Sequence, residues 1–298
     1  MDTRRGDELV MAASFELDPA RVYLNSAGQT PRLLSAQAAA QRAIERNARP
    51  WLGSLDDYLA RPHAVRVLAG RHFGVATDSI ALMPSVAYAM SFAAQRLCRP
   101  AAGRVLVLRD EHPSGEMAWH AAGYTVTRVA RCDGENWTDA LCAAIAPDVG
   151  VIVTPACHWH DGARIDLARI ATHARAVGAA LIVDATQAIG VLSLDLVSLD
   201  PDLVVVAGQK WLLGAQGLAY AYVAARHHDA AALEAQPWAR VGGVNAGGQV
   251  GTVPLPGGAR FDASGLLPSV ALAMAEPALA QVSAWGVDAI RARLAQWQ

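Results

Sequence analysis

Two short apolar runs, each leading directly into a charged residue, constrain this sequence more than any other feature. Residues 179–183 read Ala-Ala-Leu-Ile-Val and end at Asp184, while residues 203–207 read Leu-Val-Val-Val-Ala and lead into Lys210. Continuous apolar runs are typical of buried parallel strands, and open α/β sheets place their ligands at the carboxyl ends of such strands. We therefore expect Asp184 and Lys210 to lie at one edge of a parallel sheet.

A carboxylate and a primary amine at two strand ends suit an aldehyde cofactor that has a basic ring nitrogen. Lys210 can form a Schiff base with the aldehyde, and Asp184 can keep the ring nitrogen protonated so that the ring withdraws electrons. This is the arrangement that pyridoxal 5'-phosphate needs. Both residues also have an ordinary interpretation, Asp184 as a helix N-cap or polar strand end and Lys210 as a snorkelling surface lysine.

Length and composition allow one large α/β domain and disfavour several classes of partner. The 298 residues are 53% hydrophobic and carry a formal net charge of −2, which gives no reason to expect nucleic acid or an anionic membrane. No apolar stretch reaches the roughly 20 residues that span a bilayer. The N-terminus lacks the apolar run of a secretory signal, and the four cysteines contain no Cys-x-x-Cys pair, so we expect a cytoplasmic protein.

Short runs of strand type alternate with longer alanine-rich stretches of helix type, which predicts a doubly wound, mostly parallel sheet. A helix is expected from Pro31 to Ala48, a flexible glycine-rich loop after Val241, and helices again from Pro268 to Trp297. The expected strands are Ser79–Met83, Arg104–Leu108, Thr125–Val129, Val149–Val153, Ala179–Val183, Leu203–Ala207 and Leu218–Val223, and the other expected helices are Val86–Leu97, Gly115–Ala122, Trp137–Ala144, Leu167–Val177 and Ser193–Leu199.

Two further strand ends carry residues that suit the same ligand. Ser85 and Val86 follow the first strand and open a helix, where a hydroxyl and free backbone N–H groups bind phosphate well. An ordinary serine N-cap is an equally good interpretation. His112 follows the second strand and offers either a flat ring for an aromatic cofactor or a solvated loop histidine. No Walker-type or Gly-x-Gly-x-x-Gly loop is present, so a nucleotide is not favoured.

The segment from Cys157 to Gly162 reads Cys-His-Trp-His-Asp-Gly and hints at a metal site. Its ligands are crowded, however, and no distant cluster completes a tetrahedral set, so we expect no metal. We interpret the segment as a loop that lines the same sheet edge. Five loops after five strands then supply phosphate donors, a flat ring, a polar wall, a carboxylate and a lysine, and this agreement supports one shared site.

On these residues the chain resembles the class V aminotransferase family of pyridoxal-phosphate enzymes, from about Val22 to Arg293. Residues 23–28, Tyr-Leu-Asn-Ser-Ala-Gly, are similar to the family's N-terminal signature, and residues 184–187 and 209–212 are similar to its two most specific motifs. Residues 111–114, Glu-His-Pro-Ser, and residues 158–162 look closest to the kynureninase and ergothioneine-lyase branch.

The resemblance implies an aspartate-aminotransferase-like large domain of fold type I and a homodimer with its active site at the subunit interface. It also assigns the catalytic residues Lys210, Asp184 and His112 and the cofactor contacts of their neighbours. Lys210 would carry the Schiff base, Asp184 would pair with the ring nitrogen, Gln187 would contact the phenolic oxygen, His112 would stack on the ring, Ser85 and Val86 would hold the phosphate, and Gln209 would lie among the cofactor-binding residues.

Three departures from the family pattern accompany this resemblance. Ala207 stands where many members carry a phosphate-binding serine, and Gln209 replaces a common His, Tyr or Arg. The chain also stops where the small domain should continue, and Arg260 is not a safe substitute for the family's carboxylate-binding arginine. We expect an N-terminal arm over residues 1–30, a pyridoxal-phosphate-binding large domain over 31–245, and a glycine-rich loop with the start of a truncated small domain over 246–298.

The sequence thus predicts a lyase or transferase that acts on a small amino acid or its S-conjugate, with cleavage of a C–S or C–C bond favoured. An aminotransferase is one alternative, and a catalytically weak partner subunit with the same fold is a second. A third is a sheet protein in which Lys210 contacts another phosphorylated ligand. The expected partners are the small-molecule substrate and a second copy of the chain.

Overall fold

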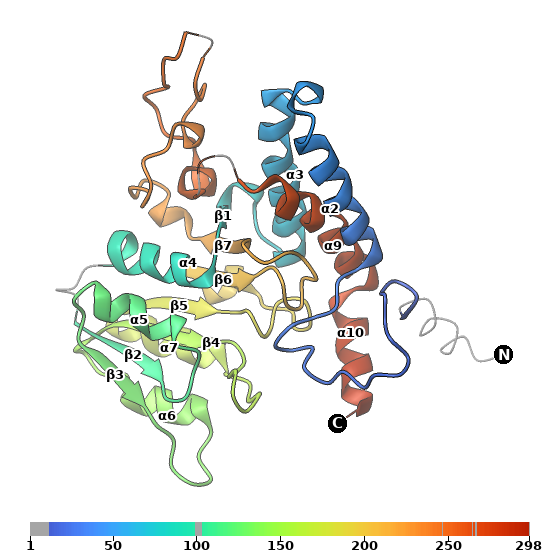
Figure 1. The fold of residues 1–298 in the computed structure, drawn as a ribbon. Coiled ribbons are helices and arrows are strands. Elements are labelled where there is room, and N and C mark those ends of the chain that lie inside the picture. Colours follow the sequence, from blue (N-terminus) through green and yellow to red (C-terminus); the bar gives the residue numbers. More distant parts are fainter. Residues whose placement is uncertain (1–11, 99–102, 246, 264, 266, 298) are drawn as a thin grey trace.

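A seven-stranded sheet forms the centre of the molecule, in the order β1-β7-β6-β5-β4-β2-β3 (Figure 1). The computed structural model describes residues 12–98, 103–245, 247–263, 265 and 267–297. The strands are β1 (Ile80–Met83), β2 (Arg104–Leu108), β3 (Val126–Val129), β4 (Val149–Pro155), β5 (Ala180–Asp184), β6 (Leu203–Ala207) and β7 (Ala219–Val223). All seven lie where the sequence predicts them, within two residues at each end.

The sheet is mostly parallel, as predicted, and β7 is the exception. Strands β3, β2, β4, β5 and β6 pair in parallel, whereas β7 runs antiparallel to both β6 and β1. The link from β6 to β7 is short and contains turns, and a parallel connection needs a crossover of a dozen or more residues. The chain therefore turns back, so that the start of β7 lies at the same sheet edge as the ends of the parallel strands.

Helices cover both faces of the sheet, because successive strand residues point to opposite sides. Val105 and Val107 pack in one apolar cluster with α4 and α5, while Leu106 and Leu108 pack in the other with α3, α6, α7, α8 and α9. The helices are α2 (Leu34–Asn47), α3 (Leu55–Phe73), α4 (Val86–Phe92), α5 (Ser114–Ala121), α6 (Trp137–Ala144), α7 (Leu167–Val177), α8 (Leu196–Leu199), α9 (Ser269–Trp285) and α10 (Val287–Leu294).

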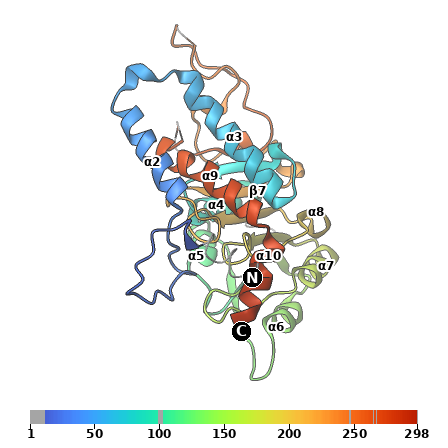
Figure 2. The same cartoon turned by 90° about the vertical axis from the view of Figure 1, so that its right-hand side faces the viewer.

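Three helices from opposite ends of the chain lie side by side at one end of the sheet (Figures 1 and 2). Helix α9 packs against both α2 and α3. Helix α3 is absent from the sequence prediction, because Pro62 interrupts a stretch whose capping box of Ser54 and Asp57 and left-handed C-cap Gly74 bound a helix. The predicted helix over Val86–Leu97 continues as one turn of π-helix beyond α4.

The glycine-rich segment after Val241 folds back on itself. Antiparallel bridges join Arg240 to Pro254 and Val244 to Val250. Within the described residues, no single helix is both long and apolar enough to cross a membrane. The pair α9 and α10 passes that test only when both are taken together across a 70° bend. The division of the chain into three parts stays a prediction.

Candidate active site at the carboxyl edge of the sheet

A cavity of about 300 Å³ lies at the edge where β1, β2, β4, β5 and β6 end and β7 begins. This is the position that open α/β sheets favour for ligands. The structure brings all seven residues that the sequence singled out to this cavity, although their roles toward a cofactor stay predictions. The seven are Ser85, Val86, His112, Asp184, Gln187, Gln209 and Lys210.

Lys210 follows β6 in a tightly packed turn. Gly208 accepts a hydrogen bond from the N–H of Gly214 at 2.8 Å, and a Cβ on Gly208 would come within 2.8 Å of the Leu218 carbonyl. Leu213, with a left-handed φ of 58°, is buried in an apolar cluster with residues of α9. The distant C-terminal helix therefore helps to fix the turn that carries the lysine.

The charge of Lys210 is disfavoured by its surroundings. Burial lowers the pKa of its amine, and the nearby carboxylates Asp184 and Glu111 oppose that shift only in part. An amine with a lowered pKa is more often neutral, and the neutral amine is the nucleophile.

Lys210 is the only lysine in the 298-residue sequence, in which the other 24 of the 25 Lys and Arg residues are arginines. Arginine serves as well as lysine for ordinary surface charges, but its guanidinium stays protonated and cannot act as an amine nucleophile. A chain that uses arginine everywhere else retains the one primary amine at this cavity. The single lysine stands at the position that the motifs also indicate, but it is found by counting residue types and not from the motifs.

Asp184 ends β5 and lines the cavity. The backbone N–H of Thr186 donates to its Oδ1 at 2.9 Å, and the hydroxyl of Thr186 accepts a hydrogen bond from the N–H of Ala207 at 3.1 Å. Burial raises the pKa of the Asp184 carboxyl, and the hydrogen bonds from Thr186 and the charges of Lys210 and His112 oppose that shift. A buried carboxylate of this kind is stabilised by a cationic partner in the cavity.

Gln187 joins the turn after β5 to two other segments. Its Oε1 accepts a hydrogen bond from the indole Nε1 of Trp211 at 2.9 Å, and its Nε2 donates to the Ala27 carbonyl at 3.2 Å. Arg32 donates to the Gln209 carbonyl at 2.7 Å. The segment that resembles the family's N-terminal signature and the residues just after it thus pack against the turns that carry Asp184 and Lys210. We call the four cavity residues of these turns, Asp184, Gln187, Gln209 and Lys210, the charged wall.

Ser85 is the N-cap of α4, as its ordinary interpretation predicts. Its Oγ accepts a hydrogen bond from the N–H of Tyr88 at 3.1 Å. The hydroxyl keeps its own proton to donate, and the first N–H groups of a helix have no intrahelical acceptor. Ser85, Val86 and Ala87 all line the cavity, so the N-cap and an anion contact are compatible.

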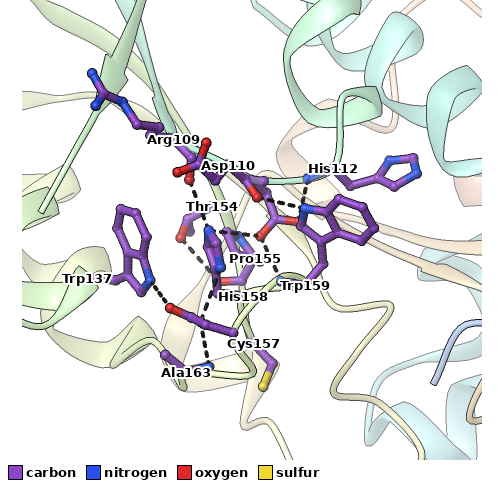
Figure 3. A network of polar contacts seen from close by, with 12 residues as sticks. Arg109, Asp110, His112, Trp137, Thr154, Pro155, Cys157, His158, Trp159 and Ala163 are labelled. Atoms are coloured by element: carbon purple, nitrogen blue, oxygen red, sulfur yellow. Dashed lines mark hydrogen bonds and ion pairs between the residues drawn. The ribbon is translucent and has the colours of Figure 1, made fainter. Parts of the chain in front are cut away.

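Three further cavity residues, Glu111, His112 and Trp159, form what we call the ring wall. Glu111 accepts hydrogen bonds from the backbone N–H of His112 at 2.8 Å and of Trp159 at 3.1 Å. The rings of His112 and Trp159 meet edge to face, with centroids 5.4 Å apart and planes at 84° (Figure 3). Burial raises the pKa of the Glu111 carboxyl, although its hydrogen bonds oppose the shift.

His158 lies behind the ring wall and not in the cavity. It is 1% exposed, stacks on Trp137 with ring centroids 4.5 Å apart, and places Nε2 3.0 Å from the Arg109 carbonyl oxygen (Figure 3). Its neighbours Cys157 and Trp159 line the cavity, in agreement with the loop interpretation of this segment. Among the described residues, no group of three or more His, Cys, Asp and Glu side chains is arranged to hold a metal ion.

Glu111, Trp159 and Cys157 are cavity residues to which the sequence gives no individual role, although Trp159 and Cys157 belong to the loop expected to line the sheet edge. The Cys157 thiol donates to the Gly162 carbonyl at 3.1 Å, and burial raises its pKa, which disfavours the reactive thiolate. Arg260 does not line the cavity and instead donates to the Leu255 carbonyl at 3.1 Å. In the sequence, Glu111 is indicated only by its position directly before His112, which is itself a predicted site residue.

Comparison with known proteins supplies an independent view of this architecture. The family model described as aminotransferase class-V matches residues 69–297. An uncharacterized aminotransferase of Bacillus subtilis, YcbU, is 28% identical over 166 residues, which are 55% of this chain and 45% of the relative. A kynureninase of Deinococcus radiodurans is 27% identical over 240 residues, 76% of this chain and 57% of the relative. The chain thus spans about half the length of these relatives.

A solved structure agrees with the fold over most of the chain. The crystal structure of the cysteine desulfurase CsdA from Escherichia coli superposes with a TM-score of 0.78 at 19% sequence identity. The match covers 94% of this chain and 73% of that one.

Proposed function

Because the chain belongs to the class V aminotransferase family, whose members are fold type I enzymes with pyridoxal 5'-phosphate as cofactor, we propose that it cleaves a C–S bond in an amino acid or its S-conjugate. The observation that carries this proposal is that one cavity holds the chain's only lysine and a buried carboxylate. The cofactor, when bound, supplies an electron sink for a carbanion at the substrate's α-carbon.

The residues of the cavity fit this cofactor. Lys210 provides the amine that its aldehyde requires, and Asp184 provides the anion that its ring nitrogen requires. Ser85 and the N–H groups at the start of α4 provide donors for its phosphate. Gln187 has one N–H on Nε2 beyond the bond to Ala27, which suits an oxygen on the ring, and His112 provides a flat surface.

Besides holding the cofactor, the amine of Lys210 would transfer a proton. Its lowered pKa leaves it able to take a proton from the substrate's α-carbon and to return it at a later stage. The carboxylate of Asp184 would keep the ring nitrogen of the cofactor protonated. The hydrogen bonds of Gln187, Trp211 and Arg32 hold the two turns in place, so that Lys210 and Asp184 line the same cavity.

The branch that residues 111–114 and 158–162 resemble favours cleavage of a C–S bond. The D. radiodurans relative is named a kynureninase, and this name favours bond cleavage over amino transfer. The alternative is an aminotransferase, which the name of the B. subtilis relative supports. A catalytically weak partner subunit is the remaining alternative.

The proposal includes a homodimer in a reducing, cytoplasmic setting. All four cysteines of the sequence are free thiols, which suits that setting.

The test is to incubate the cofactor-loaded protein with S-alkyl cysteines and to measure the products. A lyase consumes one water per turnover and releases a thiol, pyruvate and ammonia, whereas an aminotransferase releases a 2-oxo acid only when an acceptor such as 2-oxoglutarate is present. We expect thiol and pyruvate in equal amounts without an acceptor. Amino transfer alone would overturn the lyase proposal, and no turnover of any amino acid would favour the partner-subunit alternative.

Two variants of the same residue separate an amine from a plain positive charge. Lys210→Ala and Lys210→Arg are each expected to lower turnover by more than about 10³-fold, because neither retains a primary amine. If Lys210→Arg keeps its activity or its affinity for phosphate ligands while Lys210→Ala does not, Lys210 is only an electrostatic contact and the proposal fails.

A further inference from the structure

Trp159 combines two properties that seldom occur together in a loop residue. It is 47% exposed and lines the cavity, yet both of its N–H groups are bound. The indole Nε1 donates to the Asp110 carbonyl at 2.7 Å, and the backbone N–H donates to Glu111 at 3.1 Å. An exposed tryptophan whose indole N–H and backbone N–H are both bound presents a flat apolar surface without the entropic cost of ordering the ring on binding.

The contacts that fix Trp159 come from three successive residues of the loop after β2. The Arg109 carbonyl accepts from His158, the Asp110 carbonyl from the indole, and the Glu111 carboxylate from the backbone of Trp159. Asp110 has a left-handed φ of 60°, an unusual conformation for a residue other than glycine. This left-handed residue is the one whose carbonyl accepts the hydrogen bond of the indole (Figure 3).

The ring wall presents two flat groups to the cavity, and their planes are nearly at right angles to each other. The planes of His112 and Trp159 meet at 84°, so a planar ligand can lie parallel to one ring but not to both. Under the proposed function, on which this step rests, the ring of His112 takes the cofactor. The face of Trp159 is then left for a second flat group, and the substrate's side chain is the only other ligand that the reaction brings to the cavity.

We propose that Trp159 is a specificity-determining residue that favours substrates with a flat, unsaturated ring on the side chain. Glu111 acts as a positioning residue, because its carboxylate holds the backbone of both ring-bearing residues. The expected substrate class is a cysteine S-conjugate whose sulfur carries a planar ring.

The experiment compares two ligands that differ only in flatness, S-phenyl-L-cysteine and S-cyclohexyl-L-cysteine. Their dissociation constants are measured on the cofactor-loaded protein from the change in the cofactor's visible absorption. We expect the parent protein to prefer the phenyl compound by about three- to tenfold, the range of an aromatic pair.

Two variants of Trp159 separate flatness from bulk. Trp159→Phe is expected to keep most of this preference, and Trp159→Leu, which keeps an apolar side chain without a flat face, is expected to lose it. Glu111→Gln is expected to weaken the preference, because an amide offers one acceptor oxygen for two N–H donors. An equal preference in the Trp159→Leu variant and the parent would overturn the inference.

A matched control and a prior measurement keep the outcomes distinct. Trp51→Leu makes the same change at a tryptophan that is 77% exposed and does not line the cavity, so it should leave the preference unchanged. If the parent shows no cofactor absorption, the proposed function fails and the inference fails with it. If the absorption is intact and the parent shows no preference for the phenyl compound, the inference alone is wrong.

Discussion

The two walls of the cavity are built in different ways. The charged wall consists of residues at or just after the ends of β5 and β6, so the strands determine where they lie, and contacts with Ala27 and Arg32 brace their turns. The ring wall is held by contacts between the loops after β2 and β4, whose residues 109–111 and 158–159 are far apart in the sequence. The first wall supplies the reactive groups, and the second supplies flat surfaces whose angle depends on a loop-to-loop contact.

This difference predicts unequal costs when each wall is altered. Asp184→Asn keeps the shape and the hydrogen bond from Thr186 but removes the charge, so we expect turnover to fall by about 10²- to 10³-fold. His112→Phe keeps a flat ring, so we expect a loss of less than about tenfold. Steady-state kinetics of both variants at saturating cofactor measure the comparison.

The apo form of Asp184→Asn provides the control for folding. Since burial raises the pKa of Asp184 in the folded protein, its charge opposes folding at pH values above the ordinary pKa of aspartate. The neutral amide removes that cost, and the apo variant should melt no lower than the parent. A comparison in which His112→Phe loses more turnover than Asp184→Asn would break the division between the two walls.

A smaller effect concerns the pH at which the amine of Lys210, in the charged wall, becomes reactive. The neutral amine of Lys210 increases as pH rises through its folded pKa, which burial has lowered from that of ordinary lysine. The rate at which the apo protein takes up pyridoxal 5'-phosphate should therefore rise with pH and level off below pH 10.5, the ordinary value. Stopped-flow absorbance measures this profile, and a rate that still climbs through pH 10.5 would show an unperturbed amine.

The sequence was informative wherever a feature is local. All seven strands and the charged wall follow from apolar runs and the polar residue after each run, because the end of a strand and the residue next to it are determined together. Helix α3 was missed because Pro62 is tolerated inside it. The reversed direction of β7 depends on how short its connection is, a property that the strand pattern alone does not express.

The sequence singles out His112 and the loop of residues 157–162, but the contacts that fix the ring wall could not be predicted, for a physical reason. Glu111 reads as an ordinary loop carboxylate until the backbone of Trp159 is brought next to it, and Trp159 reads as a surface tryptophan until its indole meets the Asp110 carbonyl. Neither contact has a sequence period or motif. The single lysine, in contrast, is visible from the amino-acid composition alone.

The most direct test of the account is to reduce the cofactor-loaded protein with borohydride and to map the modified residue by mass spectrometry. Because the sequence contains one lysine, the result has a single expected position. We predict that the reduced cofactor is recovered on the peptide that contains Lys210, and that the Lys210→Arg variant yields no adduct. Recovery of unmodified Lys210 from protein that has bound the cofactor would contradict the central claim.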